Sequence, residues 1–264
     1  EEASDRVVAG PAKASRVYSA KEKKLVAFHE AGHVVVGLEL DEADTVHKVT
    51  IVPRGQAGGY AIMLPKEERF FTTKQELLDR IAGLLGGRVA EEIVLGEVST
   101  GAHNDFQKVT SIARAMVTEY GMSDNLGAVQ YGASQGANPF LGRDFGSDKN
   151  YSDSVAYEID KEVQDIVDTE YARTKRILTE KRELLDLIAN TLMTKETLNA
   201  QEIEHLRDHG TLPEVEEVDE VVAKEEEVTI NVTPTIETAG SATINEDVVG
   251  KHTPTTADLP KEDT

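Results

Sequence analysis

The chain is poor in several residue types, and each shortage excludes a class of protein or site. Its 264 residues include no cysteine, so disulfides and thiolate zinc ligands are excluded, and any zinc must bind histidine and carboxylate side chains. Basic residues are few, since 28 Lys and Arg stand against 49 Asp and Glu, for a net charge of −21. An acidic chain is a poor candidate for binding nucleic acid or an anionic membrane surface. We therefore expect neither partner.

Long apolar runs are missing as well. No stretch approaches the roughly 18 apolar residues that a membrane helix needs, and the sequence starts with the charged residues Glu1 and Glu2. The phosphate-loop pattern G-x-x-x-x-G-K-[ST] does not occur, so we expect no ATPase in this stretch. The sequence thus predicts a soluble chain without a membrane helix or signal peptide.

The C-terminal segment, residues 211–264, differs in composition from the rest. It holds 14 Asp and Glu against 3 Lys and Arg, and it contains no Phe, Tyr or Trp. Such a segment buries too little apolar surface to fold alone. We expect an acidic disordered tail at 211–264 and a folded domain at 1–210.

The folded part contains the pattern H-E-x-x-H, formed by His29, Glu30 and His33. On a helix, residues i and i+4 lie on the same face, so both imidazoles can bind one metal ion. Glu30 is one step round from His29, where its carboxylate can reach a water at that metal. These are the parts of a zinc peptidase, namely two His ligands, a third ligand elsewhere and a carboxylate general base.

The residues around the motif favour this interpretation over a core helix with two satisfied histidines. The segment Val26–Val35 has no charged residue other than Glu30 and the two histidines, so the helix should be buried. Two His and a Glu in an apolar segment would be costly to bury without a metal. We therefore expect a buried metal site.

Local signals predict a mainly α fold with a small sheet beside the metal helix, followed by a C-terminal helix bundle. Ser19 and Glu22 form a capping box that starts the metal helix, which should end near Leu40. Thr73 and Glu76 start another helix in the same way. The further helices are expected at 5–11, at 73–85 and 88–95 with an interruption at Gly86-Gly87, from about 105 to 121, and at about 152–178, 180–193 and 199–209.

Two short strands are expected between the first two capped helices, at 46–52 and 58–64. They predict a hairpin, and an exposed edge strand at 58–64 could bind a substrate peptide by adding it to the sheet. An ordinary structural hairpin fits the pattern equally well. Residues 121–150, rich in Gly, Asn and Ser, are expected to form a long loop.

The third metal ligand is not decided by the residues alone. The extended pattern H-E-x-x-H-x-x-G-x-x-H fails, because Val36 and Glu39 occupy its last two fixed positions. Asp105 is favoured by its place at the start of a helix after a Gly-containing loop, but an aspartate there is also a common helix cap. The open candidates are Glu42, Asp44, His47, Glu91, Glu92, His103 and Asp105.

Several segments together resemble the peptidase domain of FtsH, the membrane-anchored, ATP-dependent AAA+ zinc metalloprotease family. The resemblance covers roughly residues 1–209. The segments that carry it are His29–His33, Val46–Gly55, Gly86–Ile93, Ser99–Ala102, Asn104–Asp105 and Ala115–Thr118.

The resemblance implies a helical, zincin-like endopeptidase domain with one zinc ion per chain. It implies that His29, His33 and Asp105 bind this zinc and that Glu30 is the catalytic base. Glu91 matches an acidic family residue near the site, and we expect it to support the ligands without binding zinc. His103 is less usual at its position and is kept as an extra candidate ligand.

The resemblance also implies partners. It predicts a homohexamer on the cytoplasmic side of the cell membrane that degrades unfolded or tagged proteins delivered by an AAA+ ATPase module, with this chain as part of a longer protein. The alternative hypothesis is a non-catalytic module for assembling an AAA+ motor. An intact Glu30 argues against that alternative, because a structural metal site has no use for a base.

Overall fold

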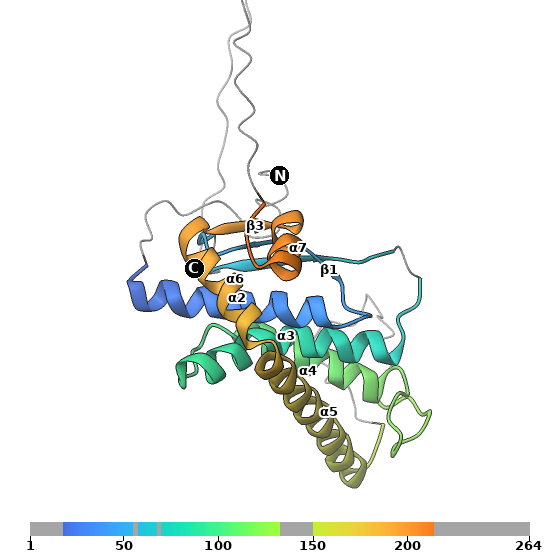
Figure 1. The fold of residues 1–264 in the computed structure, drawn as a ribbon. Helices are drawn as coiled ribbons and strands as arrows, with labels where there is room; N and C mark the ends of the chain where they lie inside the picture. The colour runs from blue at the N-terminus through green and yellow to red at the C-terminus, as the bar shows by residue number, and fades with distance from the viewer. Residues whose placement is uncertain (1–17, 55–57, 68–69, 133–149, 214–264) are drawn as a thin grey trace, which may run out of the picture. The chain divides into compact units, whose positions relative to one another are not determined.

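The computed structural model describes residues 18–54, 58–67, 70–132 and 150–213 (Figure 1). The expected helix at 5–11 and the tail beyond residue 213 lie outside this described part. The helices are α2 (Ala20–Glu39), α3 (Lys74–Leu95), α4 (His103–Thr118), α5 (Asp153–Glu180), α6 (Arg182–Lys195) and α7 (Ala200–His209), and the strands are β1 (Thr45–Thr50), β2 (Tyr60–Leu64) and β3 (Thr197–Asn199).

Helix α2 lies at the centre of the fold. Its start is fixed by the predicted capping box, in which Ser19 accepts from the backbone of Glu22 and the Glu22 side chain accepts from the backbone of Ser19. Every residue from Ala27 to Val36 is buried, because the sheet lies on one side of the helix and α3 on the other (Figure 1), and α6 packs on it as well. The H-E-x-x-H motif lies within this buried stretch.

Helix α3 is continuous, so the predicted interruption at Gly86-Gly87 was wrong. The two glycines instead let α2 and α3 cross closely. A Cβ atom added to Gly86 would lie 2.6 Å from the carbonyl oxygen of Gly32, so only glycine fits there. Glycine lowers helix propensity by about 1 kcal/mol, but the packing of this long helix outweighs that cost.

The sheet has the strand order β2-β1-β3, and both pairings are antiparallel. The predicted hairpin of β1 and β2 is confirmed, and in the structure Val49 lies opposite Ala61. Strand β3 was not predicted, and it places Leu198 on the other side of Val49. Strand β2 is therefore an edge of the described sheet.

The C-terminal helices form the predicted bundle, and the mainly α fold with a small sheet is confirmed. Helix α5 packs on α3 and α4, and α6 packs on α2. The helix ends agree with the expected ones to within two residues at α5, α6 and α7. The largest side chains that these helices bury fully are Ile159, Leu178, Leu185, Ile188, Leu192, Ile203 and Leu206.

Candidate metal centre

Three polar side chains of α2 are buried together in the middle of the molecule. His29, Glu30 and His33 expose only 8%, 5% and 9% of their surface. The two imidazoles lie one turn apart, and their Nε2 atoms are 3.2 Å from each other. Burial of this kind is costly unless the polar atoms find partners or a metal.

Each imidazole is oriented through its other nitrogen. Nδ1 of His29 donates to Oε1 of Glu91 at 2.7 Å, and Nδ1 of His33 donates to the carbonyl oxygen of Gly83 at 2.8 Å. A carbonyl oxygen and a carboxylate only accept, so both Nδ1 atoms carry the proton. In this orientation both Nε2 atoms point toward one another and toward a common point, the arrangement typical of metal-bound histidine.

Asp105 brings a carboxylate to the same point from α4. Its Oδ2 atom lies 3.4 Å from Nε2 of His29 and 3.8 Å from Nε2 of His33. One donor atom from each of these three residues lies within 4.8 Å of the other two. Ligands about 2.0–2.1 Å from a tetrahedral zinc ion are separated by roughly 3.3 Å, so this donor set fits zinc.

Glu91 lies behind His29 and away from the cluster of donor atoms. It is fully buried, and Ser99 satisfies it further, with the backbone nitrogen donating to Oε2 at 2.7 Å and Oγ donating to Oε1 at 3.0 Å. With these bonds and the one from His29, both oxygens of the carboxylate accept hydrogen bonds, and the group fixes the orientation of the imidazole. These contacts fit the supporting role that the resemblance implies for Glu91.

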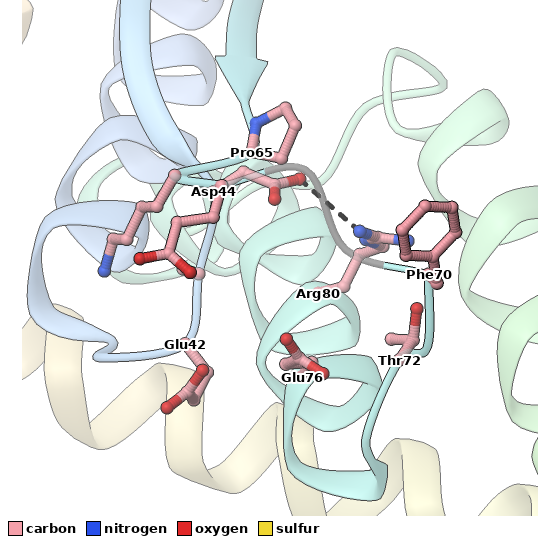
Figure 2. Close-up of a pocket in the computed structure, with 10 residues that line it drawn as sticks. Glu42, Asp44, Pro65, Phe70, Thr72, Glu76 and Arg80 are labelled. Atoms are coloured by element: carbon pink, nitrogen blue, oxygen red, sulfur yellow. Dashed lines mark ion pairs between the residues drawn. The ribbon is translucent and has the colours of Figure 1, made fainter.

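The other candidate ligands lie elsewhere. Asp44 forms an ion pair with Arg80, in a pocket that Glu42 also lines (Figure 2). Glu92 binds Lys175 at 2.8 Å on the side of α3 that meets α5. Among the described residues, the donor cluster holds only His29, His33 and Asp105. The two remaining candidates are both exposed: His47 and His103.

The electrostatics of the cluster favour a cation. Burial acts to lower the pKa of His29, but hydrogen bonds to Asp105 and Glu91 outweigh it and raise this pKa to about 10. Burial and the neighbouring charge of His29 lower the pKa of His33 to about 4. The cluster thus holds a positive charge among carboxylates, and a divalent ion satisfies the same charges.

Glu30 is next to this cluster but makes no bond to the other donor atoms. Burial raises the pKa of its carboxyl to about 7. The backbone just before β2 passes close to it, since a Cβ atom added to Gly59 would lie 2.8 Å from Oε1 of Glu30. A carboxyl group that titrates near neutral pH is suited to taking and returning a proton.

Sequence reasoning missed the contacts that α3 makes with the two histidines. The carbonyl of Gly83 holds His33, and Gly87 leaves room for the His29 ring, since a Cβ atom there would lie 2.5 Å from Nε2. Gly83, Gly87 and Glu91 are spaced four residues apart, so they share one face of α3. That spacing is a signal in the sequence, whereas glycine propensity alone predicts a helix break at Gly86-Gly87.

Comparison with known proteins identifies the family. Residues 16–206 match the model of Peptidase family M41. The chain belongs to peptidase family M41. The match confirms the resemblance that the motifs predicted, and it covers the whole of the donor cluster.

Curated relatives of this M41 chain carry the name ATP-dependent zinc metalloprotease FtsH. The protein of Bacillus subtilis (strain 168) is 65% identical over 232 residues, which is 88% of this chain and 36% of the relative. That of Alkalihalophilus pseudofirmus is 64% identical over 214 residues, covering 81% and 32%, and that of Staphylococcus haemolyticus is 60% identical over 227 residues, covering 86% and 31%. The chain spans about a third of the length of these relatives.

The family match and the names of the relatives confirm the predicted enzyme class. The chain is a peptidase domain of family M41, and the relatives that it matches are named as zinc metalloproteases. They give no support to the alternative of a non-catalytic assembly module. Among the described helices, none combines the length and apolar character that a membrane span requires.

Proposed function

We propose that His29, His33 and Asp105 hold one zinc ion per chain. We propose further that the chain hydrolyses peptide bonds with Glu30 as the general base. The observation that carries the proposal is the convergence of two Nε2 atoms and one carboxylate oxygen within 4.8 Å, directly beside a buried Glu30. When bound, zinc supplies Lewis-acid chemistry, in that it polarises a carbonyl group and lowers the pKa of water.

The chain's own residues contribute orientation and proton transfer. Glu91 and the carbonyl of Gly83 hold the two imidazoles with Nε2 toward the common point. Glu30 accepts a proton from the attacking water and returns it to the leaving amine. The buried surroundings exclude other water and strengthen these interactions.

We place the substrate along the outer edge of β2. This strand pairs with β1 on one side and is an edge of the described sheet, which suits the addition of an extended peptide. Gly59 precedes β2 directly and lies against Glu30. A peptide added at this edge would therefore pass the base, and backbone pairing would let it accept many sequences.

For the longer protein we propose the wider role that the resemblance implies. In this role a homohexamer on the cytoplasmic side of the cell membrane degrades unfolded or tagged proteins, which an AAA+ ATPase module delivers. The supporting observations are the relatives' printed name, which includes ATP dependence, and their greater length. Within this chain, we propose a peptidase domain at 1–210 and a separate acidic tail at 211–264.

Replacing Glu30 by Gln tests the role of the base. The change keeps the size of the side chain and removes its ability to take a proton, so casein hydrolysis should fall by at least about a hundredfold. Zinc content, measured by atomic absorption, should stay at one ion per chain, because Glu30 is not among the proposed ligands.

The matched control is Glu39→Gln, on the same helix. Glu39 pairs with Lys181 at 2.9 Å on the far end of α2, so this variant should keep both zinc and activity. Unchanged turnover in Glu30→Gln would remove Glu30 from the mechanism. Loss of zinc in that variant would make Glu30 a ligand.

A further inference from the structure

The third donor atom of the cluster comes from a helix whose start is not fixed by its own cap. Asp105 is the third residue of α4, and the N-cap residue Ala102 makes no side-chain hydrogen bond to the helix. His29 and His33 are on α2. The distance between the carboxylate and the imidazoles therefore depends on how the loop at 96–102 and the first turn of α4 are attached to the rest of the fold.

Ser99 attaches this loop to α3 with all three of its polar groups. Its backbone nitrogen and its Oγ donate to the carboxylate of Glu91. Its carbonyl oxygen accepts from Nη2 of Arg88 at 2.8 Å. Glu91 and Arg88 are three residues apart and lie on the same side of α3. The loop is thus held by a carboxylate and a guanidinium group together.

Arg88 also contacts the first turn of α4. Its guanidinium carbon lies 5.1 Å from the centre of the Phe106 ring, within range of a cation–π contact. Phe106 follows Asp105 directly, and its backbone nitrogen makes the first hydrogen bond of this turn, to Ala102, at 3.0 Å. One side chain therefore joins α3, the loop and the turn that carries Asp105.

We propose that Arg88 is a positioning residue that sets the place of the Asp105 carboxylate relative to the two histidines. This proposal rests on the proposed function, in which Asp105 is a metal ligand. Gly87, the neighbour of Arg88, lies against the His29 ring, and Glu91 holds the same ring. Helix α3 thus fixes both halves of the site, the imidazole through Gly87 and Glu91 and the carboxylate through Arg88.

The chemistry of the contacts requires arginine. A planar guanidinium group can donate to the Ser99 carbonyl in its own plane while its face lies on the Phe106 ring. The ammonium group of lysine is a point charge and does not reproduce both contacts at once. Arg88 is half-buried, and its Nε atom has no hydrogen-bond partner among the described residues. Arg88 also interacts with the charge of Glu92 on its own helix, whereas the Ser99 bond and the Phe106 ring are its contacts to the loop and to α4.

The test compares Arg88→Met and Arg88→Lys with the control Arg114→Met. Arg114 is on α4, the helix that carries Asp105, but it pairs with Asp160 at 3.0 Å on the surface. Zinc affinity is measured by competition with a chelator, and the melting temperature is measured without metal. Both Arg88 variants should bind zinc about 10–100-fold more weakly, the usual effect of losing a group that supports a ligand, while the control stays at the wild-type value.

Cobalt(II) in place of zinc gives a spectroscopic test of ligand geometry. The visible absorption bands should change in the Arg88 variants and stay the same in Arg114→Met. If Arg88→Met also melts at a lower temperature without metal, its weaker zinc binding could come from lost stability. Phe106→Leu then tests the positioning role, because it removes the aromatic ring and keeps an apolar side chain. Wild-type zinc affinity and cobalt spectra in Arg88→Lys and Phe106→Leu would overturn the proposal.

A double-mutant cycle separates this proposal from the proposed function. If Arg88 acts through Asp105, adding Arg88→Met to Asp105→Ala should change zinc affinity by less than about threefold. An equal loss in both backgrounds would contradict the positioning role. If Asp105→Ala alone binds zinc like the wild type, Asp105 is not a ligand, and the proposed metal site fails whatever Arg88 does.

Discussion

At the scale of single residues, the imidazole of His29 is held from three directions. Glu91 binds Nδ1 at 2.7 Å, Nε2 lies 3.4 Å from Asp105, and Gly87 lies against the ring. The ring therefore has little freedom to move, which holds Nε2 in the orientation that a metal ion requires.

This arrangement predicts the effect of Gly87→Ala. The new methyl group would lie 2.5 Å from Nε2 of His29, so the ring must leave the position in which Nε2 lies beside His33 and Asp105. Zinc affinity should fall by roughly 10–100-fold, as for other changes that misplace a ligand. Chelator competition measures the change.

Gly83→Ala on the same helix is the control. A Cβ atom at Gly83 meets nothing within 4 Å, and the backbone carbonyl that holds His33 is kept. Zinc affinity should stay unchanged, and stability should rise by up to about 1 kcal/mol through helix propensity. If Gly87→Ala binds zinc as tightly as Gly83→Ala, the contact with Gly87 does not set the ring position.

The sequence was most informative where chemistry depends on local spacing. His29, Glu30 and His33 are predictable because four residues make one helical turn, and this needs no knowledge of the rest of the fold. Asp105 was one of seven candidates, because the approach of α4 to α2 is a tertiary property. The Gly83 carbonyl and the Ser99 anchor were not predicted, since backbone groups and loop contacts leave little trace in residue types.

At the scale of secondary structure, helix starts were predictable from side chains that cap them. Ser19 and Thr73 each form the expected capping box, and Asn199 forms another at the start of α7. Glycine in a helix was harder to interpret. Gly86 indicates a break by propensity but in fact allows α2 and α3 to touch, so a weak local preference is overridden by packing.

Strand β3 was missed for a different reason, because its residues carry no local signal for a strand. Its three residues, Thr197–Asn199, are too few for an alternating pattern, and Asn199 also caps α7. What makes this segment a strand is its partner β1, where Thr50 faces Thr197 and their hydroxyl oxygens lie 2.8 Å apart. Pairing between segments this distant in sequence is not visible in local composition.

At the scale of the whole molecule, the last helix that contributes to the described core, α7, ends before the acidic segment at 211–264 begins. Ile203 and Leu206 of α7 are buried, and Gly210 ends this helix in the left-handed conformation, donating to the carbonyl of Leu206 at 3.0 Å. The family match ends at residue 206. The residues that build the site are thus supported by contacts within the proposed peptidase domain.

Truncation after Gly210 should therefore leave the domain intact. The removed segment has no aromatic residue and many like charges, and its loss keeps the cap of α7. We expect a nearly unchanged melting temperature and unchanged casein hydrolysis. A large fall in either would show that the tail docks on the domain or completes an assembly.

The central claim is that His29, His33 and Asp105 bind the zinc while Glu91 only supports His29. Zinc per chain, measured by atomic absorption after gel filtration of Asp105→Ala and Glu91→Ala, tests it most directly. The wild type should carry one zinc. Asp105→Ala should lose it in buffer without added zinc, because two imidazoles alone hold the ion weakly, and Glu91→Ala should keep zinc when it is supplied, with affinity lower by roughly 10–100-fold. An empty Glu91→Ala beside a loaded Asp105→Ala would reverse the two roles and contradict the account.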